Sequence, residues 1–476
     1  MAAVAWSGLE RLSSQLIRFI IGIILARLLF PAEFGLIAML GVFIGVAYLF
    51  ANCGFGEGLI QKQNTTIQDE SSVFYINILF GALAASGLYA AAPWIAGFYH
   101  QPILTSLTRL MAVDVVINSF GIIQTMLLSK KLDFKTQLKV SVVSTIISGS
   151  IAIEMAMRGF GVLSLAVQVL IGDTLRVLFL WVFHDWRPSL VFCLSSLRGL
   201  LPFGSKLFAS GLLNTVFSEI YSLVIGRIYT PTTLGLYSRA KQMQQLPVDN
   251  LSGIVGRVAF PVFASVQQDK AQLKRGLQKA IKGLVLINFP IMAGLAATAH
   301  PLVLALLTKK WEACAPYIQL LCVGGALYPL SLIHLNALQA QGRSDLFLRL
   351  EVIKKIVLAS TVCITFRYGV KGLLVGDIFV STLATWLNSH YAVRLVNYSR
   401  KEQVLDLLPY AAISALMGTG VWLIGHVAWG TSYLQLGVQI VSGLTLYALG
   451  CRLFRPAAFS EACEAVISRI PRWNPA

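Results

Sequence analysis

The stretch Ala26–Leu36 reads ARLLFPAEFGL, and the stretch Gly226–Leu236 reads GRIYTPTTLGL. Both contain a small residue, Arg, three further residues, Pro, three further residues, and then Gly and Leu. The shared positions recur after 200 residues: Arg27 and Arg227, Pro31 and Pro231, and Gly35 and Gly235. Self-similarity at one fixed period is the signature of a repeated structural unit. The sequence therefore predicts two copies of one unit, and the weaker echo between Phe160–Val162 and Tyr368–Val370 keeps nearly the same period.

The composition around this repeat is that of a membrane protein. Of the 476 residues, 12% are charged and 56% are hydrophobic, whereas a soluble domain carries about 25% charge. So little charge cannot coat the surface of a water-soluble chain of this length. A protein that crosses the membrane many times is the prediction.

Apolar runs long enough to span a bilayer, about 20 residues each, follow one another along the whole chain. Cutting at charge clusters, Pro and Gly gives about fourteen spans. They lie near residues 12–30, 35–51, 73–99, 108–128, 138–157, 161–184, 203–229, 243–266, 283–307, 315–340, 350–367, 370–393, 409–429 and 432–454.

The repeat period divides these spans into two sets of six. An even number of spans gives both copies the same orientation, related by a pseudo-two-fold axis along the membrane normal. We expect an all-α polytopic fold with an N-terminal lobe (1–198), a C-terminal lobe (199–400), and two further helices with a cytoplasmic tail (401–476).

The formal charge of +17 lies in short clusters between apolar runs, which favours helix orientation over nucleic-acid binding. About 25 of the 38 Lys and Arg fall at the two ends and in the loops after even-numbered spans. The positive-inside rule then predicts that both termini are cytoplasmic.

Recognisable catalytic and metal motifs are missing from the sequence. It has no GxxxxGK[ST], HExxH, GxSxG or CxxC motif, and its seven cysteines are odd in number and scattered. The predicted loops are too short to hold a soluble catalytic domain. We therefore expect a transporter and not an enzyme, with no cofactor and no metal.

A polar stripe runs along one face of the first predicted helix, at Arg11, Ser14, Gln15, Arg18 and Gly22, at helical spacing. A shift of 200 residues places Gly211, Asn214, Thr215, Ser218 and Ser222 in the seventh helix. Both stripes are expected to face a groove between the lobes. An Arg in the bilayer costs at least ~2.5–3.5 kcal/mol. Its guanidinium must therefore meet water, a substrate anion or a carboxylate, for which Glu219 is a candidate.

Other ionisable residues in the predicted spans lie at helical spacing. Asp173 and Arg176 are three apart, and Glu154 and Arg158 are four apart, so each pair can neutralise itself. Isolated polar groups either join helices by hydrogen bonds or take part in function: Asp114, Asn118, Gln124, Asn336, Gln339, Asp377 and Asn388.

Several motifs together resemble one family: ILARLLFPAEFGLIAM, GFGEGLIQKQ, LVIGRIYTPTTLGLYSRAKQ, GRVAFPVFASVQQD and LQAQGRSDLFLRLEVIKK. The chain is similar to the Wzx-type polysaccharide flippases of the multidrug/oligosaccharidyl-lipid/polysaccharide (MOP) exporter superfamily, closest to the colanic-acid-type branch. The resemblance implies two six-helix lobes around a central cavity and alternating access. It also implies a substrate, undecaprenyl-pyrophosphate-linked O-antigen or exopolysaccharide units, moved across the bacterial inner membrane.

In similar flippases, arginines of the first helix face the pyrophosphate, and Arg18 is the matching position. Arg27 lies nearer the periplasmic end, and Ser218 stands where a second cation would be. The expected substrate-binding residues are Arg18, Arg27, Ser14, Gln15, Asn214, Ser218, Glu219, Arg176 and Arg257.

Two other classes stay open, a drug exporter of the same fold and a membrane polysaccharide polymerase or ligase. The expected partners are the lipid-linked substrate, the bilayer and other polysaccharide-assembly proteins, with no nucleic acid.

Overall fold

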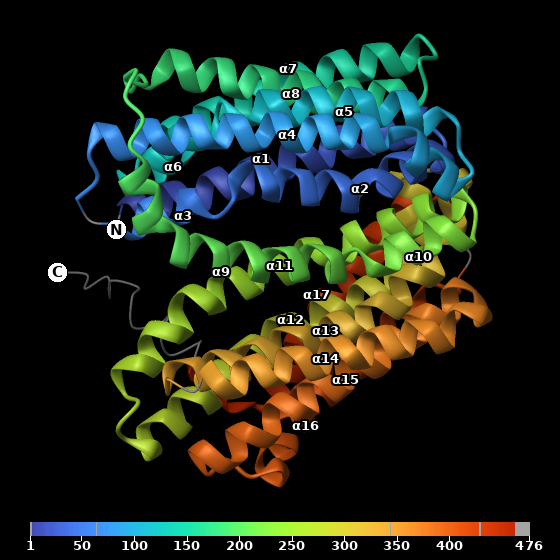
Figure 1. Ribbon diagram of the computed structural model, residues 1–476. Coiled ribbons are helices and arrows are strands. Elements are labelled where there is room, and N and C mark those ends of the chain that lie inside the picture. Colours follow the sequence, from blue (N-terminus) through green and yellow to red (C-terminus); the bar gives the residue numbers. More distant parts are fainter. Residues whose placement is uncertain (1, 63, 343, 428–429, 462–476) are drawn as a thin grey trace, which may run out of the picture. The chain divides into compact units, whose positions relative to one another are not determined.

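A computed structural model describes residues 2–62, 64–342, 344–427 and 430–461 (Figure 1). These residues form α-helices and two short 3-10 helices, with no strand among them, which confirms the predicted all-α class. The helices are α1 (Ala2–Leu28), α2 (Pro31–Asn52), α3 (Phe55–Gln61), α4 (Ile67–Tyr99), α5 (Ile103–Ser119), α6 (Ile122–Lys130), α7 (Phe134–Met157), α8 (Val162–Phe183), α9 (Leu194–Ser218), α10 (Ile220–Ile228), α11 (Pro231–Ser265), α12 (Lys270–Leu306), η1 (Lys309–Cys314), α13 (Ala315–Ala340), α14 (Ser344–Thr365), η2 (Phe366–Tyr368), α15 (Gly369–Val396), α16 (Arg400–Ile424) and α17 (Ser432–Phe454).

Each predicted span overlaps one helix or two consecutive helices. By length and composition, 8 helices of the described residues can cross a membrane, or 10 if the bent pairs α5–α6 and α9–α10 each count as one span. Helices α1, α11, α14 and α15 fall short of that test; α14, for instance, carries the ion pair of Glu351 with Lys354. The number fourteen stays a prediction.

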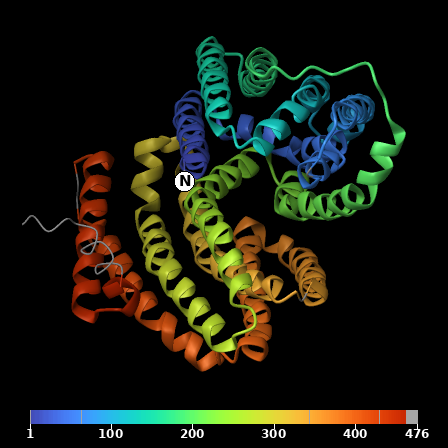
Figure 2. The same ribbon diagram turned by 90° about the vertical axis from the view of Figure 1, so that its left-hand side faces the viewer.

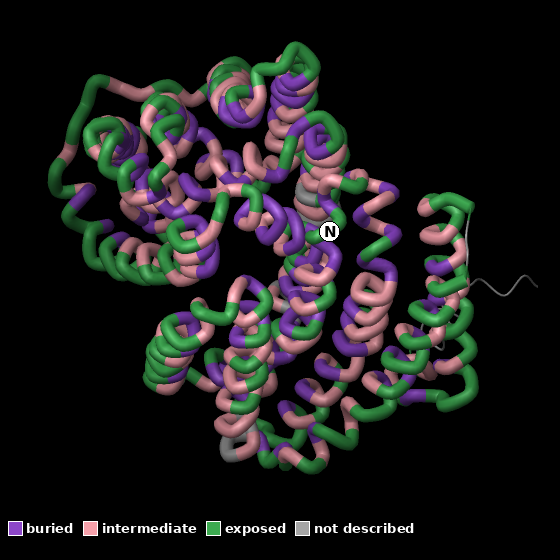
Figure 3. The backbone as a smooth tube through the Cα atoms, turned by 90° about the vertical axis from the view of Figure 1, so that its right-hand side faces the viewer, coloured by how far each residue is buried: buried purple, intermediate pink, exposed green. Residues whose placement is uncertain are grey.

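The chain divides into two compact units, Met1–Ser238 and Arg239–Ala476. Unit 1 thus holds α1 to α10 and the first two turns of α11, and unit 2 holds the rest. The border between the two units lies inside α11. The border between the two lobes, which the sequence places at residue 198, stays a prediction. In both units, buried residues follow the inward faces of the helices and exposed residues the outward faces (Figure 3).

In unit 1, α7 packs against both α1 and α8, while α4 and α5 pack against each other and α5 against α8. A cluster of buried apolar side chains joins α1, α7 and α8: Ile21, Leu25, Leu29, Ala152, Ala156 and Leu165. A second cluster joins α3, α4, α6 and α9: Phe55, Leu59, Val73, Phe74, Ile123, Leu127, Leu197 and Leu200.

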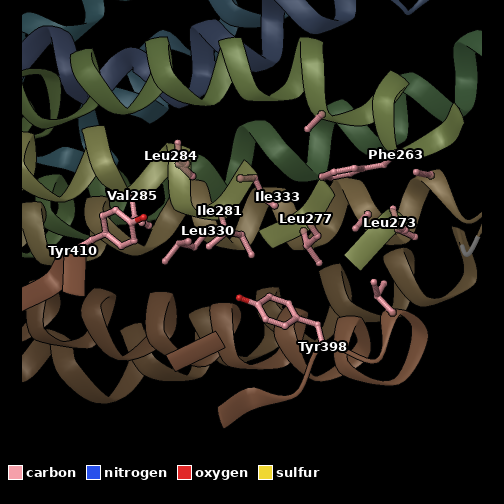
Figure 4. Packing of buried hydrophobic residues seen from close by; sticks show 14 residues of the cluster. Phe263, Leu273, Leu277, Ile281, Leu284, Val285, Leu330, Ile333, Tyr398 and Tyr410 are labelled. Carbon is pink, nitrogen blue, oxygen red and sulfur yellow. The ribbon is translucent and has the colours of Figure 1, made fainter. Parts of the chain in front are cut away.

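In unit 2, α12 packs against α13, α16 and α17, and α16 and α17 (orange-red to red) lie beside α12 (yellow) in Figure 2. The core between α12, α13 and α16 contains Leu277, Ile281 and Ile333, and the rings of Tyr398 and Tyr410 close it (Figure 4). Ion pairs fasten α16 to α12 at one end: Lys274 to Glu402 at 2.8 Å and Lys282 to Asp406 at 2.9 Å.

The repeated motif starts a helix in both copies. Pro31 and Pro231 are the first residues of α2 and α11, the position where a missing N–H is harmless and the fixed φ suits a helix. At α2, the Glu33 carboxylate accepts a hydrogen bond from Phe30 N at 2.7 Å. At α11, the Thr230 hydroxyl accepts one from Thr233 N at 3.2 Å. At α2 the accepting side chain is that of the third helical residue, and at α11 it is that of the residue before the helix, so the two starts are capped in different ways.

The two motif copies meet inside unit 1, where the first turns of α2 and α11 touch. A Cβ added at Gly35 would overlap the carbonyl oxygen of Pro231, and a Cβ added at Gly235 would overlap that of Pro31. The contact is reciprocal, as a local two-fold axis requires. Only glycine permits so close an approach of two backbones, which explains why the motif repeats Gly and Pro at these positions.

We expect Gly35→Ala and Gly235→Ala each to lower the free energy of unfolding by about 1–3 kcal/mol, since overpacking forces the backbones apart. Thermal unfolding of the purified protein in detergent measures the change. Gly41→Ala in the same helix α2 is the matched control, because no atom lies within 4 Å of its added Cβ. Equal melting temperatures for Gly35→Ala and Gly41→Ala would show that the close contact does not exist.

Candidate functional site

Arg18 lies on an exposed face of α1, at the level of the middle of α7. One turn before it, Ser14 is fully buried and its Oγ lies 2.9 Å from Ser141 Oγ on α7. One turn after it, Ile21 packs against Gly149 of α7. These two contacts place Arg18 level with the middle of α7, which is a candidate membrane span by length and composition.

The other two predicted residues of α1 differ in exposure. Gln15 is half-buried, and its amide oxygen is buried without a hydrogen bond from the part of the chain that the structure describes. Arg27 is exposed in the last turn of α1, close to the motif contact at the start of α2. Within the polar stripe of α1, Ser14 is therefore buried against α7 and Arg18 is exposed, and Arg27, beyond the stripe, is exposed as well.

The predicted counterparts on α9 lie at a break in the helix. Asn214 and Ser218 are exposed, and Ser218 Oγ donates to the carbonyl oxygen of Thr215 at 3.0 Å. Glu219 is half-buried and joins α9 to α10, which are bent by 43°. Helix α9, like α1, therefore has exposed polar side chains in unit 1. The pairing of Arg18 with Glu219 stays a prediction.

The predicted pairs at helical spacing are confirmed. Arg158 Nε lies 2.7 Å from Glu154 Oε1 on α7, and Arg176 Nε lies 3.7 Å from Asp173 Oδ1 on α8. The first pair is exposed. In the second, the side chains are 38% (Arg176) and 23% (Asp173) exposed. Arg176 is therefore engaged by a carboxylate of its own helix.

Sequence reasoning missed the partner that joins Asp173 to Asp114. The Tyr48 hydroxyl on α2 donates to Asp114 Oδ2 on α5 and lies 3.4 Å from Asp173 Oδ2 on α8. Asp114 is fully buried, and its Oδ1 has no hydrogen-bond partner among the described residues. The sequence marks Asp114 only as an isolated polar group, because nothing near it in the sequence links it to residue 48. Arg257 lies within α11, but its side chain is outside the described part of the structure.

Each unit also contains an apolar cavity among the described residues. In unit 2, a cavity of about 510 Å³ lies between α12, α16 and α17. Its polar lining residues donate hydrogen bonds within the protein: Gln439 Nε2 to Val421 O at 2.9 Å, the Tyr447 hydroxyl to Leu286 O at 2.6 Å and the Thr298 hydroxyl to Gly294 O at 2.8 Å. Gln439 Oε1 has no hydrogen-bond partner among the described residues. In unit 1, a cavity of about 640 Å³ lies between α2, α4, α9 and α10. The walls of both cavities suit a hydrocarbon chain, since they offer almost no free polar group.

Comparison with known proteins now identifies the family. Residues 24–316 match the model of a family described as polysaccharide biosynthesis protein. The chain belongs to this family. The teichuronic acid biosynthesis protein TuaB of Bacillus subtilis (strain 168) is 30% identical over 73% of this chain and 72% of the relative. The succinoglycan biosynthesis transport protein ExoT of Rhizobium meliloti (strain 1021) is 26% identical over 86% of this chain and 81% of the relative.

A solved structure shows the same fold. The lipid II flippase MurJ, in an inward closed conformation, is 14% identical with a TM-score of 0.77, and the match covers 95% of this chain and 98% of that one. The resemblance to polysaccharide flippases is therefore confirmed. The family match and the flippase fold also confirm the predicted class of a multi-pass membrane transporter rather than an enzyme.

Proposed function

We propose that this member of the polysaccharide biosynthesis protein family moves lipid-linked oligosaccharides across the bacterial inner membrane by alternating access. The substrate is an undecaprenyl-pyrophosphate-linked O-antigen or exopolysaccharide repeat unit. The family match, the relative named as a succinoglycan transport protein and the flippase fold support this function. Contacts with other polysaccharide-assembly proteins stay a prediction.

The observation that carries the proposal is the exposed Arg18 level with the middle of α7, a helix long and apolar enough to cross a membrane. A guanidinium facing hydrocarbon there costs at least ~2.5–3.5 kcal/mol, so its position is stable only beside water or an anion. A pyrophosphate is the anion that such a substrate brings, and a guanidinium binds phosphate oxygens through two parallel hydrogen bonds. Arg27, the second predicted arginine of α1, is exposed as well and lies nearer the end of the helix, on the face opposite to Arg18 because nine residues make two and a half turns.

The remaining predicted residues have supporting roles. Asn214, Ser218 and Gln15 offer the neutral hydrogen-bonding groups that sugar hydroxyls need, whereas Ser14, also predicted to bind the substrate, is fully buried and lies within hydrogen-bonding distance of Ser141. Glu219, at the 43° break between α9 and α10, carries the negative charge that would compete for Arg18 and release the anion. Arg176 and Arg257 are the further cations proposed for the pyrophosphate, although Arg176 already contacts Asp173.

We expect Arg18→Ala to abolish surface polysaccharide while lipid-linked units accumulate on the cytoplasmic side. A hydrogen bond to a charged group is worth ~1.5–3 kcal/mol, which corresponds to an affinity loss of roughly tenfold to a hundredfold. Arg18→Lys should retain part of the activity, since it keeps the charge and loses the paired geometry. Arg18→Glu should be as inactive as Arg18→Ala. Staining of surface glycan and extraction of the lipid-linked pool measure both effects.

Arg158→Ala is the matched control, because Arg158 is an exposed arginine of the same unit that pairs with Glu154. It should leave export unchanged. Normal polysaccharide from both Arg18→Ala and Arg18→Glu would contradict the proposal and favour an exporter of cationic small molecules.

We further propose that both termini, and with them the loop between α8 and α9, face the cytoplasm. Cys193 ends this loop, and its Sγ lies 3.0 Å from Ser195 Oγ. Hydrogen bonds from the Ser195 and Ser196 side chains lower the pKa of the Cys193 thiol to about 7. A thiol with a lowered pKa is more reactive at neutral pH because its thiolate is already present.

A membrane-impermeant maleimide is therefore expected to label a variant whose only cysteine is Cys193 in inside-out vesicles and not in right-side-out vesicles. The labelling rate should rise as the pH increases through about 7 and fall below it, whereas the denatured protein should show its rise near ~8.5. Mass spectrometry of the labelled peptide measures the rate. Labelling only in right-side-out vesicles would reverse the proposed topology.

A further inference from the structure

Three helices of unit 1 bring four ionisable groups together, one of which, Arg176, is also a predicted substrate-binding residue. Tyr48 belongs to α2, Asp114 to α5, and Asp173 and Arg176 to α8. The Tyr48 hydroxyl donates to Asp114 and lies 3.4 Å from Asp173 Oδ2. Both carboxylates are therefore within reach of one phenol, although 59 residues separate them in the sequence (114 and 173).

The charges of this cluster do not balance. Two ionised carboxylates and one guanidinium leave one negative charge, because the phenol of Tyr48 is neutral. Arg176 Nε is 3.7 Å from Asp173 Oδ1, which is beyond hydrogen-bonding distance. This nitrogen donates no hydrogen bond to any of the described residues. Removing a charge from water costs several kcal/mol unless it is paired. The addition of one proton makes the cluster neutral.

Other charges nearby are already engaged. The helices that pack on α5 are α2, α4 and α8, and the charges that act on Asp114 are those of Asp173 and Arg176. On α5 itself, Arg109 lies over the Tyr89 ring of α4, 4.7 Å from its centroid. On α7, which packs on α8, Glu154 and Arg158 neutralise each other. None of these contacts supplies the missing positive charge.

The two carboxylates differ in a way that assigns the proton to one of them. Asp114 is fully buried, and its Oδ1 is without a hydrogen-bond partner in the described part of the chain. Asp173 has the guanidinium beside it and a side chain that is 23% exposed. The ionised form is favoured where a cation and water are near. Asp173 is thus the carboxylate with a cation beside it and the more exposed of the two, and Asp114 is the one to which the proton is assigned.

We propose that Tyr48, Asp114, Asp173 and Arg176 form a binding site for one exchangeable proton, which resides on Asp114 and reaches it through Asp173. The proton comes from water and returns to water, so no other reactant is needed. When both carboxylates are ionised, the single hydroxyl hydrogen of Tyr48 must serve both of them. When Asp114 is protonated, its own hydroxyl is a second hydrogen-bond donor in the cluster. That this proton is bound and released during transport rests on the proposed function.

The test uses the full-length protein in lipid nanodiscs and needs no substrate. Infrared difference spectra between acidic and alkaline pH should contain the carbonyl stretch of a protonated buried carboxyl. Asp114→Asn, which keeps the shape and the acceptor for Tyr48, should remove this band. Tyr48→Phe should shift its frequency, because the hydrogen bond to Asp114 is lost. Glu154→Gln is the control, since Glu154 is exposed and paired, and it should leave the band unchanged.

An unchanged band in Asp114→Asn would overturn the proton site. So would a spectral change at fixed pH that follows added sodium chloride, which would assign a metal cation instead. The melting temperature of Asp114→Asn shows that the variant is folded.

Loss of polysaccharide export in folded Asp114→Asn is expected, and normal export would remove the proton from the transport cycle. The infrared result and the export phenotype of Arg18 variants are independent. A failure of the proton site therefore leaves the proposed substrate standing, and a failure of the substrate leaves the proton site standing.

Discussion

A bilayer interior offers no water, so every polar group placed there must find its partner within the protein or beside a wet surface. This constraint governs the whole architecture of the chain. The backbone satisfies it by forming helices, and the described residues contain no strand. Some side chains satisfy it within their own helix, as Ser144 does by donating to Val140 O at 2.7 Å, and others across helices, as Asn288 of α12 does by donating to Ala326 O of α13 at 3.0 Å. Asp114 Oδ1 is one of the buried atoms that have no hydrogen-bond partner among the described residues, and a function is proposed for it.

The fold was largely readable from the sequence because its determinants are local or periodic. Apolar runs predict helices, and the recurrence of Pro31 and Gly35 at Pro231 and Gly235 predicts a repeat. The bends within these apolar runs could not be predicted from the sequence. Residues 108–128 are one apolar run, yet α5 and α6 are bent by 43°, with Gly121 packed against Val177 of α8. That bend depends on a neighbour that hydropathy does not reveal.

The candidate site shows the same division. Asp173 with Arg176, and Glu154 with Arg158, were predicted because three or four residues along a helix bring side chains together. The contact of Tyr48 with Asp114 requires α2 and α5 to be placed side by side, and a single sequence carries no signal for that. The close approach at Gly35 is intermediate: the repeat marks the glycine, but only the structure shows that the opposing group is the Pro231 carbonyl.

Unit 1 therefore contains two charged sites of opposite sign, Arg18 on α1 and the cluster that includes Asp173 on α8. Helix α7 touches both α1 and α8. Consecutive residues of α7 make these contacts: a Cβ added at Gly172 of α8 would lie 3.2 Å from Ser148 Oγ, and Gly149 packs against Ile21 of α1. Gly172 precedes Asp173, and Ile21 is one turn from Arg18. Binding at two sites is coupled only if both ligands favour the same arrangement of a shared element. In unit 1, α7 packs against both α1, which carries Arg18, and α8, which carries Asp173, so a coupling between the proposed anion and the proposed proton would pass through α7. The tight packing at Ser148 and Gly149 leaves little room for α1 and α8 to move independently of α7.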